Sequence, residues 1–211
     1  MSRVLNTSES PHPRLPGIQK TYHPETDRHA LGTARLYLAL VNYFQDTPDV
    51  YVSSRRPVHY EPDDPTALVI PDIFIVRGVA KKNRRTLNPW EEKSPDLAIE
   101  FTSHSAWLED MGTKRALYAE LGVAEYFIYD PIQEYLKPPL QGYRLAQNDY
   151  APIAPDAHGK FHSAILDLDL QIVNDDLRLF DPRTQKFLLT PLEAQEEVER
   201  LRAELKKLRG E

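Results

Sequence analysis

The sequence contains no cysteine and no long apolar run, and both absences restrict the kind of protein it can encode. Without cysteine the chain forms no disulfide bond and no thiolate metal site, which is typical of proteins kept in the reducing cytoplasm. No segment approaches the roughly 20 apolar residues of a membrane-spanning helix, and no apolar stretch near the N-terminus resembles a secretory signal. We therefore expect a cytoplasmic protein with neither a membrane nor a disulfide-bonded partner.

Glycine is also scarce, with 8 residues against 18 prolines, which indicates rigid connecting loops. The 211 residues, 41% of them hydrophobic, are enough for one well-filled core. The formal net charge of −6 disfavours a protein that coats nucleic acid, but local basic segments decide whether an enzyme contacts DNA. The sequence has two such basic segments, and each is either a phosphate-binding loop or a solvated loop. The first contains Arg55 and Arg56, and the second contains Lys81, Lys82, Arg84 and Arg85.

Apolar periodicity predicts an α/β (α+β) fold in which helices flank a mixed β-sheet. A helix is expected over residues 27–44, capped by Thr26, with an apolar stripe formed by Ala30, Ala34, Tyr37, Val41 and Phe44. The β-branched run at 67–76 predicts a buried strand, in which Pro71 implies a sheet edge or a bulge.

The pattern continues with a strand at 96–102, a second helix and further strands. The helix is expected over residues 105–121, with Ser105 as its cap and Gly122 as its terminator. A strand at 125–129 and several antiparallel strands between 142 and 189 complete the main domain, which extends over residues 26–190. Residues 1–25 are polar and proline-rich, so we expect a flexible N-terminal arm.

The last segment, residues 191–211, has the composition of an amphipathic, coiled-coil-like helix with many charges. Its apolar residues recur at steps of four and three, and they are Ala194, Val198, Leu201, Leu205 and Leu208. A seam of about two heptads is too short to be stable alone. The helix therefore either docks on its own domain or helps to form a homodimer.

The strand at 96–102 carries a carboxylate on a face that should be buried. Side chains alternate along a strand, so Asp96, Glu100 and Thr102 share one face. The following helix has the opposite anomaly, because Lys114 lies on its apolar stripe. Since an unpaired buried ammonium costs several kcal/mol, we expect Lys114 to face Glu100, either as a structural ion pair or as part of a site.

Asp72 adds a second carboxylate if the strands at 67–76 and 96–102 pair as a hairpin. Two neighbouring carboxylates repel, and a divalent cation commonly resolves this repulsion. Oxygen ligands with retained waters favour Mg²⁺, with Mn²⁺ as the alternative. Such an ion can polarise a phosphodiester and activate water, and a nearby lysine can stabilise the developing charge or help to deprotonate the water.

These residues resemble the pattern of a known family. The segments "IPD" with Asp72, "DLAIEFTS" with Glu100 and "DMGTKRALYAELGVAEYFIYDP" with Lys114 are similar to the Uma-two family of restriction endonucleases, in the PD-(D/E)XK nuclease superfamily. The resemblance is strongest from residue 71 to residue 131. It implies a restriction-endonuclease-like domain over residues 26–190, with a charged helical tail.

The resemblance also implies roles for individual residues. Asp72 and Glu100 would bind the metal together with the carbonyl of Phe101, and Lys114 would be the catalytic cation. The superfamily's usual lysine, two residues after the second acid, is replaced by Thr102, so Lys114 would supply that charge from the helix.

Several further residues are candidates for supporting roles. Asp110 is a helical neighbour of Lys114, and the hydroxyl of Tyr118 is expected to bind a site carboxylate. Asp96 is either a further acidic ligand or a solvated residue at the start of the strand. Glu25 and His29 either approach the site or lie on the surface.

Three functions remain open at this point. The first is a magnesium-dependent endonuclease that hydrolyses DNA phosphodiester bonds. The second is a catalytically inactive module with the same fold, which binds nucleic acid or protein and pairs through its C-terminal helix. The third is a metal-dependent hydrolase of a small phosphate ester, since two carboxylates and a metal do not fix the size of the substrate.

Overall fold

A mixed six-stranded sheet forms the centre of the computed structural model, which describes residues 26–209. The predicted arm at 1–25 therefore lies outside the described residues. In spatial order the strands are β1 (Val50–Ser54), β4 (Ile73–Arg77), β5 (Leu97–Phe101), β6 (Glu125–Tyr129), β7 (Leu140–Ala146) and β8 (Asp149–Pro152). β5 and β6 run parallel, and all other neighbours in this sheet are antiparallel. The expected α+β class with a mixed sheet is confirmed.

Two smaller sheets complete the β-structure. The four-stranded antiparallel sheet has the order β12 (Lys186–Phe187), β11 (Asp176–Asp181), β10 (Leu168–Val173) and β9 (Phe161–Ser163). The two-stranded sheet pairs β2 (Val58–His59) with β3 (Leu68–Val69). The expected single strand at 67–76 is thus divided between two sheets. Pro71 lies at the break, because it has no N–H to donate to a ladder.

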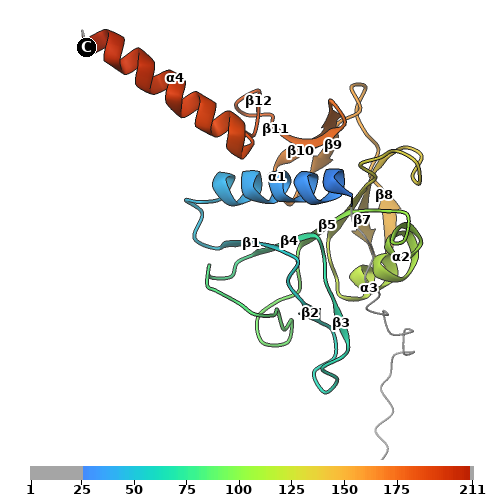
Figure 1. Cartoon of the computed structure of the whole chain (residues 1–211). Helices are drawn as coiled ribbons and strands as arrows, with labels where there is room; N and C mark the ends of the chain where they lie inside the picture. Colours follow the sequence, from blue (N-terminus) through green and yellow to red (C-terminus); the bar gives the residue numbers. More distant parts are fainter. Residues whose placement is uncertain (1–25, 210–211) are drawn as a thin grey trace, which may run out of the picture.

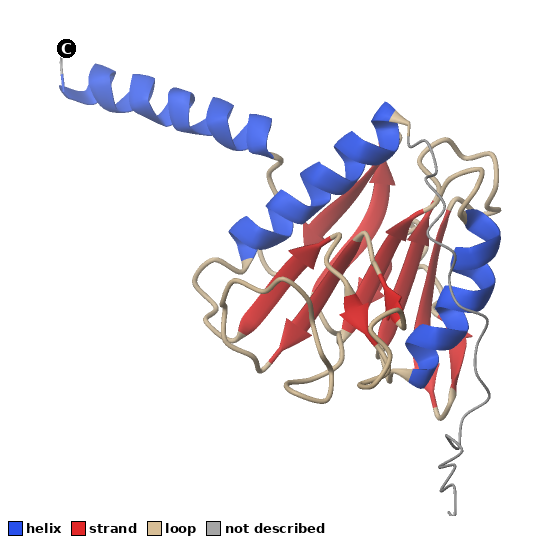
Figure 2. Cartoon of the chain, turned by 60° about the horizontal axis from the view of Figure 1, so that its bottom comes forward, coloured by secondary structure: helices blue, strands red, loops and turns tan. Residues whose placement is uncertain are grey.

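Different elements cover the two faces of the central sheet (Figures 1 and 2). Helix α1 (Asp27–Tyr43) and the four-stranded sheet cover one face, and they share its core with alternate residues of β4, β5 and β6. The β2–β3 pair and a three-part helix cover the other face. This helix consists of α2 (Trp107–Glu109), the π-helix η1 (Asp110–Lys114) and α3 (Arg115–Glu120).

Helix α1 begins as predicted but buries a different stripe. Thr26 is its N-cap and accepts a hydrogen bond from the backbone N–H of His29 at 3.2 Å. Of the expected stripe, Tyr37 and Phe44 pack partly buried against the core, but Ala30, Ala34 and Val41 are exposed. The buried residues of the helix are His29, Gly32, Thr33, Leu36, Ala39 and Leu40. Gly32 explains the rotation, because a Cβ at this position would lie 2.8 Å from the ring of Phe101. The buried face of the helix therefore combines the small residues Gly32 and Ala39 with Leu36 and Leu40.

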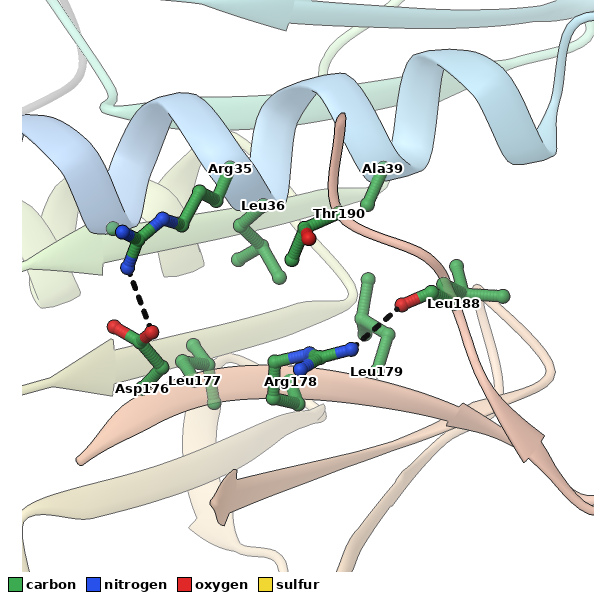
Figure 3. A pocket seen from close by; sticks show the side chains of 10 residues that line it. Arg35, Leu36, Ala39, Asp176, Leu177, Arg178, Leu179, Leu188 and Thr190 are labelled. Atoms are coloured by element: carbon green, nitrogen blue, oxygen red, sulfur yellow. Dashed lines mark hydrogen bonds and ion pairs between the residues drawn. The ribbon is translucent and has the colours of Figure 1, made fainter. Parts of the chain in front are cut away.

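Helix α4 (Pro191–Arg209) is attached to the body only at its first turn. Figure 3 shows the segment that precedes α4, with Leu188 and Thr190 beside a narrow apolar gap between α1 and β11. The Arg35–Asp176 ion pair (2.7 Å) closes one end of this gap. Arg178 binds the backbone carbonyl of Leu188 at 3.1 Å and Glu193 at 2.8 Å. Glu193 in turn accepts the backbone N–H of Thr190 at 2.7 Å, which completes a capping box.

Beyond this first turn α4 projects away from the body (Figures 1 and 2). None of its residues is buried. No helix among residues 26–209 has the length and apolar character needed to cross a membrane.

Candidate active site

The carboxylates of Asp72 and Glu100 meet where β4 begins and β5 ends. β4 and β5 form the expected antiparallel pair, with Ile73 opposite Ile99. Oδ2 of Asp72 accepts the backbone N–H of Phe101 at 2.9 Å, and Oε2 of Glu100 accepts the backbone N–H of Asp72 at 3.2 Å. Each carboxylate is therefore held by the strand that carries the other one, and the two acids lie on the same side of the sheet.

Lys114 reaches this pair from the π-helix. Its Nζ lies 3.2 Å from Oε1 of Glu100 and 2.9 Å from Oδ1 of Asp110. The hydroxyl of Tyr118 donates to Oε1 of Glu100 at 2.6 Å. The structure thus brings together Asp72, Glu100, Asp110, Lys114 and Tyr118, all of which the sequence singled out.

The helix that carries Lys114 differs from the expected regular helix over 105–121. It starts at Trp107 without a side-chain cap, while the hydroxyl of Ser105 lies 3.4 Å from that of Ser103. Its middle turn, Asp110–Lys114, is a π-helix. This form is rare in proteins as a whole, and where it occurs it is often at a functional site. The hydroxyl of Tyr126 donates to the backbone carbonyl of Asp110 at 3.0 Å and supports this turn from β6. The wider turn holds Asp110 and Lys114 together against the sheet. The end at Gly122 is as predicted, with a φ of 74°.

Two further residues complete the surroundings of Asp72. His29, on the first turn of α1, places its Nε2 3.3 Å from Oδ2 of Asp72 and is only 5% exposed. Nε of Arg55 lies 3.6 Å from Oδ1 of Asp72, and an outer nitrogen of the same guanidinium lies 3.4 Å from Nδ1 of His29. The surface was one of two expected positions for His29, and that alternative is wrong. Glu25 lies outside the described residues.

Arg55 is fixed at the site by its backbone. It follows β1 with a φ of 50°, which is uncommon for a residue with a side chain. Its N–H donates to the carbonyls of Pro71 and Asp72, at 3.1 and 3.2 Å. Its side chain remains 44% exposed, so the guanidinium lies at the solvent side of Asp72.

Burial and neighbouring charges shift the pKa values of the central groups. Burial is the main cause that raises the pKa of Glu100 to about 8, against the opposing effect of the Lys114 ammonium. Burial alone would lower the pKa of Lys114, but the carboxylates of Glu100, Asp110 and Asp72 outweigh it and raise this pKa. Burial would likewise raise the pKa of Asp72, but His29, Lys114 and the amide of Phe101 together lower it.

Thr102 and Asp96, on the same strand face as Glu100, have different surroundings. Thr102 is 1% exposed, and its Oγ1 has no hydrogen-bond partner among the described residues. Asp96 is held at the other end of β5, where its carboxylate accepts the backbone N–H of Arg77 at 2.7 Å and lies 2.6 Å from Nζ of Lys93. Asp96 therefore has a structural role away from the cluster.

The basic segment at 81–85 does not join the site. Arg84 is 6% exposed, forms an ion pair with Glu92 at 2.5 Å and stacks on the ring of Tyr51, so its predicted role as a phosphate ligand has to be given up. Lys82 also pairs with Glu92, at 3.1 Å, and Nζ of Lys81 binds the carbonyls of Phe44 and Gln45 at the end of α1. These lysines line a cavity beside the C-terminal end of α1, about 22 Å along the helix from His29.

The donor set suits a hard divalent cation that shares its coordination with a substrate. Among residues 26–209, no group of three or more His, Asp or Glu side chains could enclose a metal ion by itself. Mg²⁺ commonly uses one or two carboxylates and completes its shell with waters and phosphate oxygens. Apart from the ion pair with Lys114, both carboxylate oxygens of Asp110 are buried without a hydrogen-bond partner. Asp72, Glu100 and Asp110 thus bring three carboxyl groups to the cluster, where Lys114 contacts Glu100 and Asp110 and Arg55 lies beside Asp72.

Comparison with known proteins identifies the family to which this chain belongs. The chain matches the Uma2 family, described as "Putative restriction endonuclease", over residues 16–173, which is well over half of its length. The chain therefore belongs to the Uma2 family.

A crystal structure of "a putative nuclease belonging to DUF820" from Anabaena variabilis ATCC 29413 is similar to it. The TM-score is 0.48 and the sequence identity 15%, over 66% of this chain and 74% of that one. No curated protein matches this chain.

Proposed function

We propose that this protein is a divalent-metal-dependent endonuclease that hydrolyses DNA phosphodiester bonds at the Asp72–Glu100–Lys114 cluster. The observation that carries the proposal is the buried excess of carboxylate at the junction of β4 and β5, with a lysine ammonium in contact with it. Membership of the Uma2 family supports DNA as the substrate.

Asp72 and Glu100 would hold Mg²⁺ or Mn²⁺, which when bound supplies Lewis-acid polarisation of the phosphate and a more acidic water. The chain orients both carboxylates in advance. Tyr118 and the amide of Asp72 fix Glu100, while His29 and the amide of Phe101 fix Asp72. Such preorganisation removes the cost of rearranging polar groups during the reaction.

Lys114 acts as a fixed positive charge in this proposal. Its pKa is raised, so the ammonium stays protonated at neutral pH and does not serve as a general base. Because it contacts Glu100 from the helix, it can stabilise negative charge that develops on a phosphate bound beside that carboxylate. Lys114 thereby supplies the positive charge of the motif lysine, whose position in this chain is occupied by Thr102.

Arg55 is the best-placed residue for binding the substrate. Its guanidinium is half-exposed and lies next to Asp72, and guanidinium groups bind phosphate through two parallel hydrogen bonds. Lys81, Lys82 and Arg85 lie on the more distant loop, where they would contact the DNA backbone only outside the reacting phosphate.

A catalytically inactive module for nucleic-acid or protein interaction is the second candidate. The observation that favours it is Thr102, which is buried at the position where the superfamily motif has lysine. In that case Glu100 and Lys114 form a structural ion pair between strand and helix.

Plasmid cleavage distinguishes the two functions. The full chain should nick supercoiled plasmid in the presence of Mg²⁺ or Mn²⁺ and lose this activity in EDTA. Asp72→Asn should abolish nicking and also the increase in melting temperature that Mg²⁺ causes by binding the native state. Asp96→Asn is the matched control, because it neutralises an acid at the opposite end of β5 and should retain activity.

Folded protein that never nicks DNA with either metal would overturn the proposed endonuclease activity. Nicking that survives in a folded Asp72→Asn variant would show that the active site lies elsewhere.

A further inference from the structure

The protruding helix α4 presents a continuous apolar seam to solvent. The four largest residues of the seam are between 45% and 79% exposed, and they are Val198, Leu201, Leu205 and Leu208. The first turn is held by the capping box of Thr190 and Glu193 and by Arg178. Because that first turn is fixed, the helix cannot fold back on its own domain without breaking these bonds.

The charges beside the seam select the partner. In heptad notation Val198 and Leu205 occupy a positions, and Ala194, Leu201 and Leu208 occupy d positions. The g positions, which precede each a, are then Glu197 and Glu204. The e positions after the last two d residues are Arg202 and Arg209. One side of the seam is acidic and the other is basic.

We propose that α4 pairs with α4 of a second copy of this chain as a parallel two-stranded coiled coil. In a parallel pair each g residue faces the e residue of the next heptad on the partner, so Glu197 meets Arg202 and Glu204 meets Arg209 of the second copy. In an antiparallel pair g faces g and e faces e, which places glutamates against glutamates and arginines against arginines. The charge pattern therefore fits a second copy in the parallel orientation alone.

Other charged groups on α4 are compatible with this pairing. Glu197 forms an ion pair with Arg200 on its own helix at 2.5 Å, and both groups are exposed enough for Glu197 to bridge to the second copy as well. The remaining charges, among them Glu196, Glu199, Lys206 and Lys207, occupy the outer b, c and f positions. They face solvent in a two-stranded coil.

The geometry has a consequence for the whole assembly. Each main domain is attached to the N-terminal end of α4, so a parallel coil places both domains at the same end. Two copies of the carboxylate cluster then lie at the same end of the coil. A seam of little more than two heptads also makes the association reversible and dependent on concentration.

Sedimentation equilibrium of the full chain tests the association. The wild-type protein should approach twice the mass of one chain as its concentration rises. Leu201→Asp combined with Leu205→Asp should remain a monomer with an unchanged melting temperature, because no residue of α4 is buried. Arg202→Glu combined with Arg209→Glu should weaken association by about tenfold or more, since like charges then face each other at e and g. Ala203→Asp, at an outer f position, is the control and should associate like the wild type.

Single cysteines test the orientation, because the natural chain has none. Leu208→Cys lies near the tip of the seam, where only a parallel pair brings the two thiols together, so oxidation should give a covalent dimer. Ala203→Cys should give none. A wild-type monomer at all concentrations, or a dimer that persists in the Leu201→Asp, Leu205→Asp variant, overturns the interface. A seam-dependent dimer without the Leu208→Cys cross-link overturns the parallel orientation. None of these outcomes depends on nuclease activity.

Discussion

Replacing Lys114 with methionine removes the one ammonium that balances the buried carboxylates and keeps a side chain of similar length. Glu100 and Asp110 are each only 1% exposed, and both lie within 3.2 Å of Nζ. Removing one partner of a buried ion pair costs about 3–5 kcal/mol, because the remaining charge stays desolvated. Since small domains are stable by only about 5–15 kcal/mol, we expect Lys114→Met to be severely destabilised at neutral pH.

A second substitution should restore part of the stability that is lost in Lys114→Met. In Lys114→Met with Asp110→Asn, one of the two carboxylates that contact Nζ is neutral, so less uncompensated charge remains in the core. The coupling between the two positions should be about 1–3 kcal/mol, as for residues in direct contact. Urea unfolding followed by tryptophan fluorescence measures it from the midpoints at constant m-value, and Trp107 lies in the same helix. Comparison of nicking by the folded double variant with nicking by Asp110→Asn alone then assigns the further loss of activity to Lys114.

Additivity would refute this reasoning. If the double variant loses the sum of the two single losses, Lys114 does not stabilise the protein through Asp110. If Lys114→Met alone costs less than about 1 kcal/mol, the value of an exposed ion pair, the ammonium is not holding a buried cluster together.

Two further predictions concern pH and DNA binding. The pKa of Glu100 is raised from 4.5 to about 8, so the folded protein retains a proton that the unfolded chain releases within this window. The stability of the metal-free protein should therefore fall as the pH rises from 5 to 8, and Glu100→Gln should flatten the urea midpoints over that range. Equal slopes in both proteins would contradict the assignment. Arg55→Ala should weaken DNA binding and reduce the slope of log K against log salt by about 1. Arg56→Ala, the adjacent arginine, is the matched control, and an equal effect of both would show that Arg55 has no special place at the site.

The pairing of Glu100 with Lys114 was predictable from local periodicity. Alternation along a strand and the stripe of a helix each place a charged residue on a buried face, and burial of a charge requires a partner. The position of Asp72 beside Glu100 was expected only on the condition that the two strands pair as a hairpin, and β4 and β5 do pair in this way. The cap at Thr26 was expected from its residue type and position. These features depend on residues that lie within one helix or strand, or within two that follow each other along the chain.

The stripe of α1 was predicted incorrectly because the apolar pattern was followed through Ala30, Ala34 and Val41, and the polar residues His29 and Thr33 were left out of the buried face. The face that contacts the sheet contains Gly32 and Thr33 next to His29, and its close approach depends on the ring of Phe101. Small residues at helical spacing, continued by Leu36 and Leu40, were the available signal. Reading that stripe would have placed His29 inside the protein.

The sequence by itself determined the start of α1, the strands β5 and β6 and the need for Glu100 and Lys114 to meet, because these depend on periodic patterns and on the cost of an unpaired buried charge. Only the tertiary structure decided that His29 and Arg55 surround Asp72, that Arg84 is buried against Glu92, and that a π-helical turn holds Asp110 beside Lys114. These contacts join residues from elements that local patterns do not connect. Packing of the whole chain selects them, and so the polar surroundings of the site emerge only when the core is assembled.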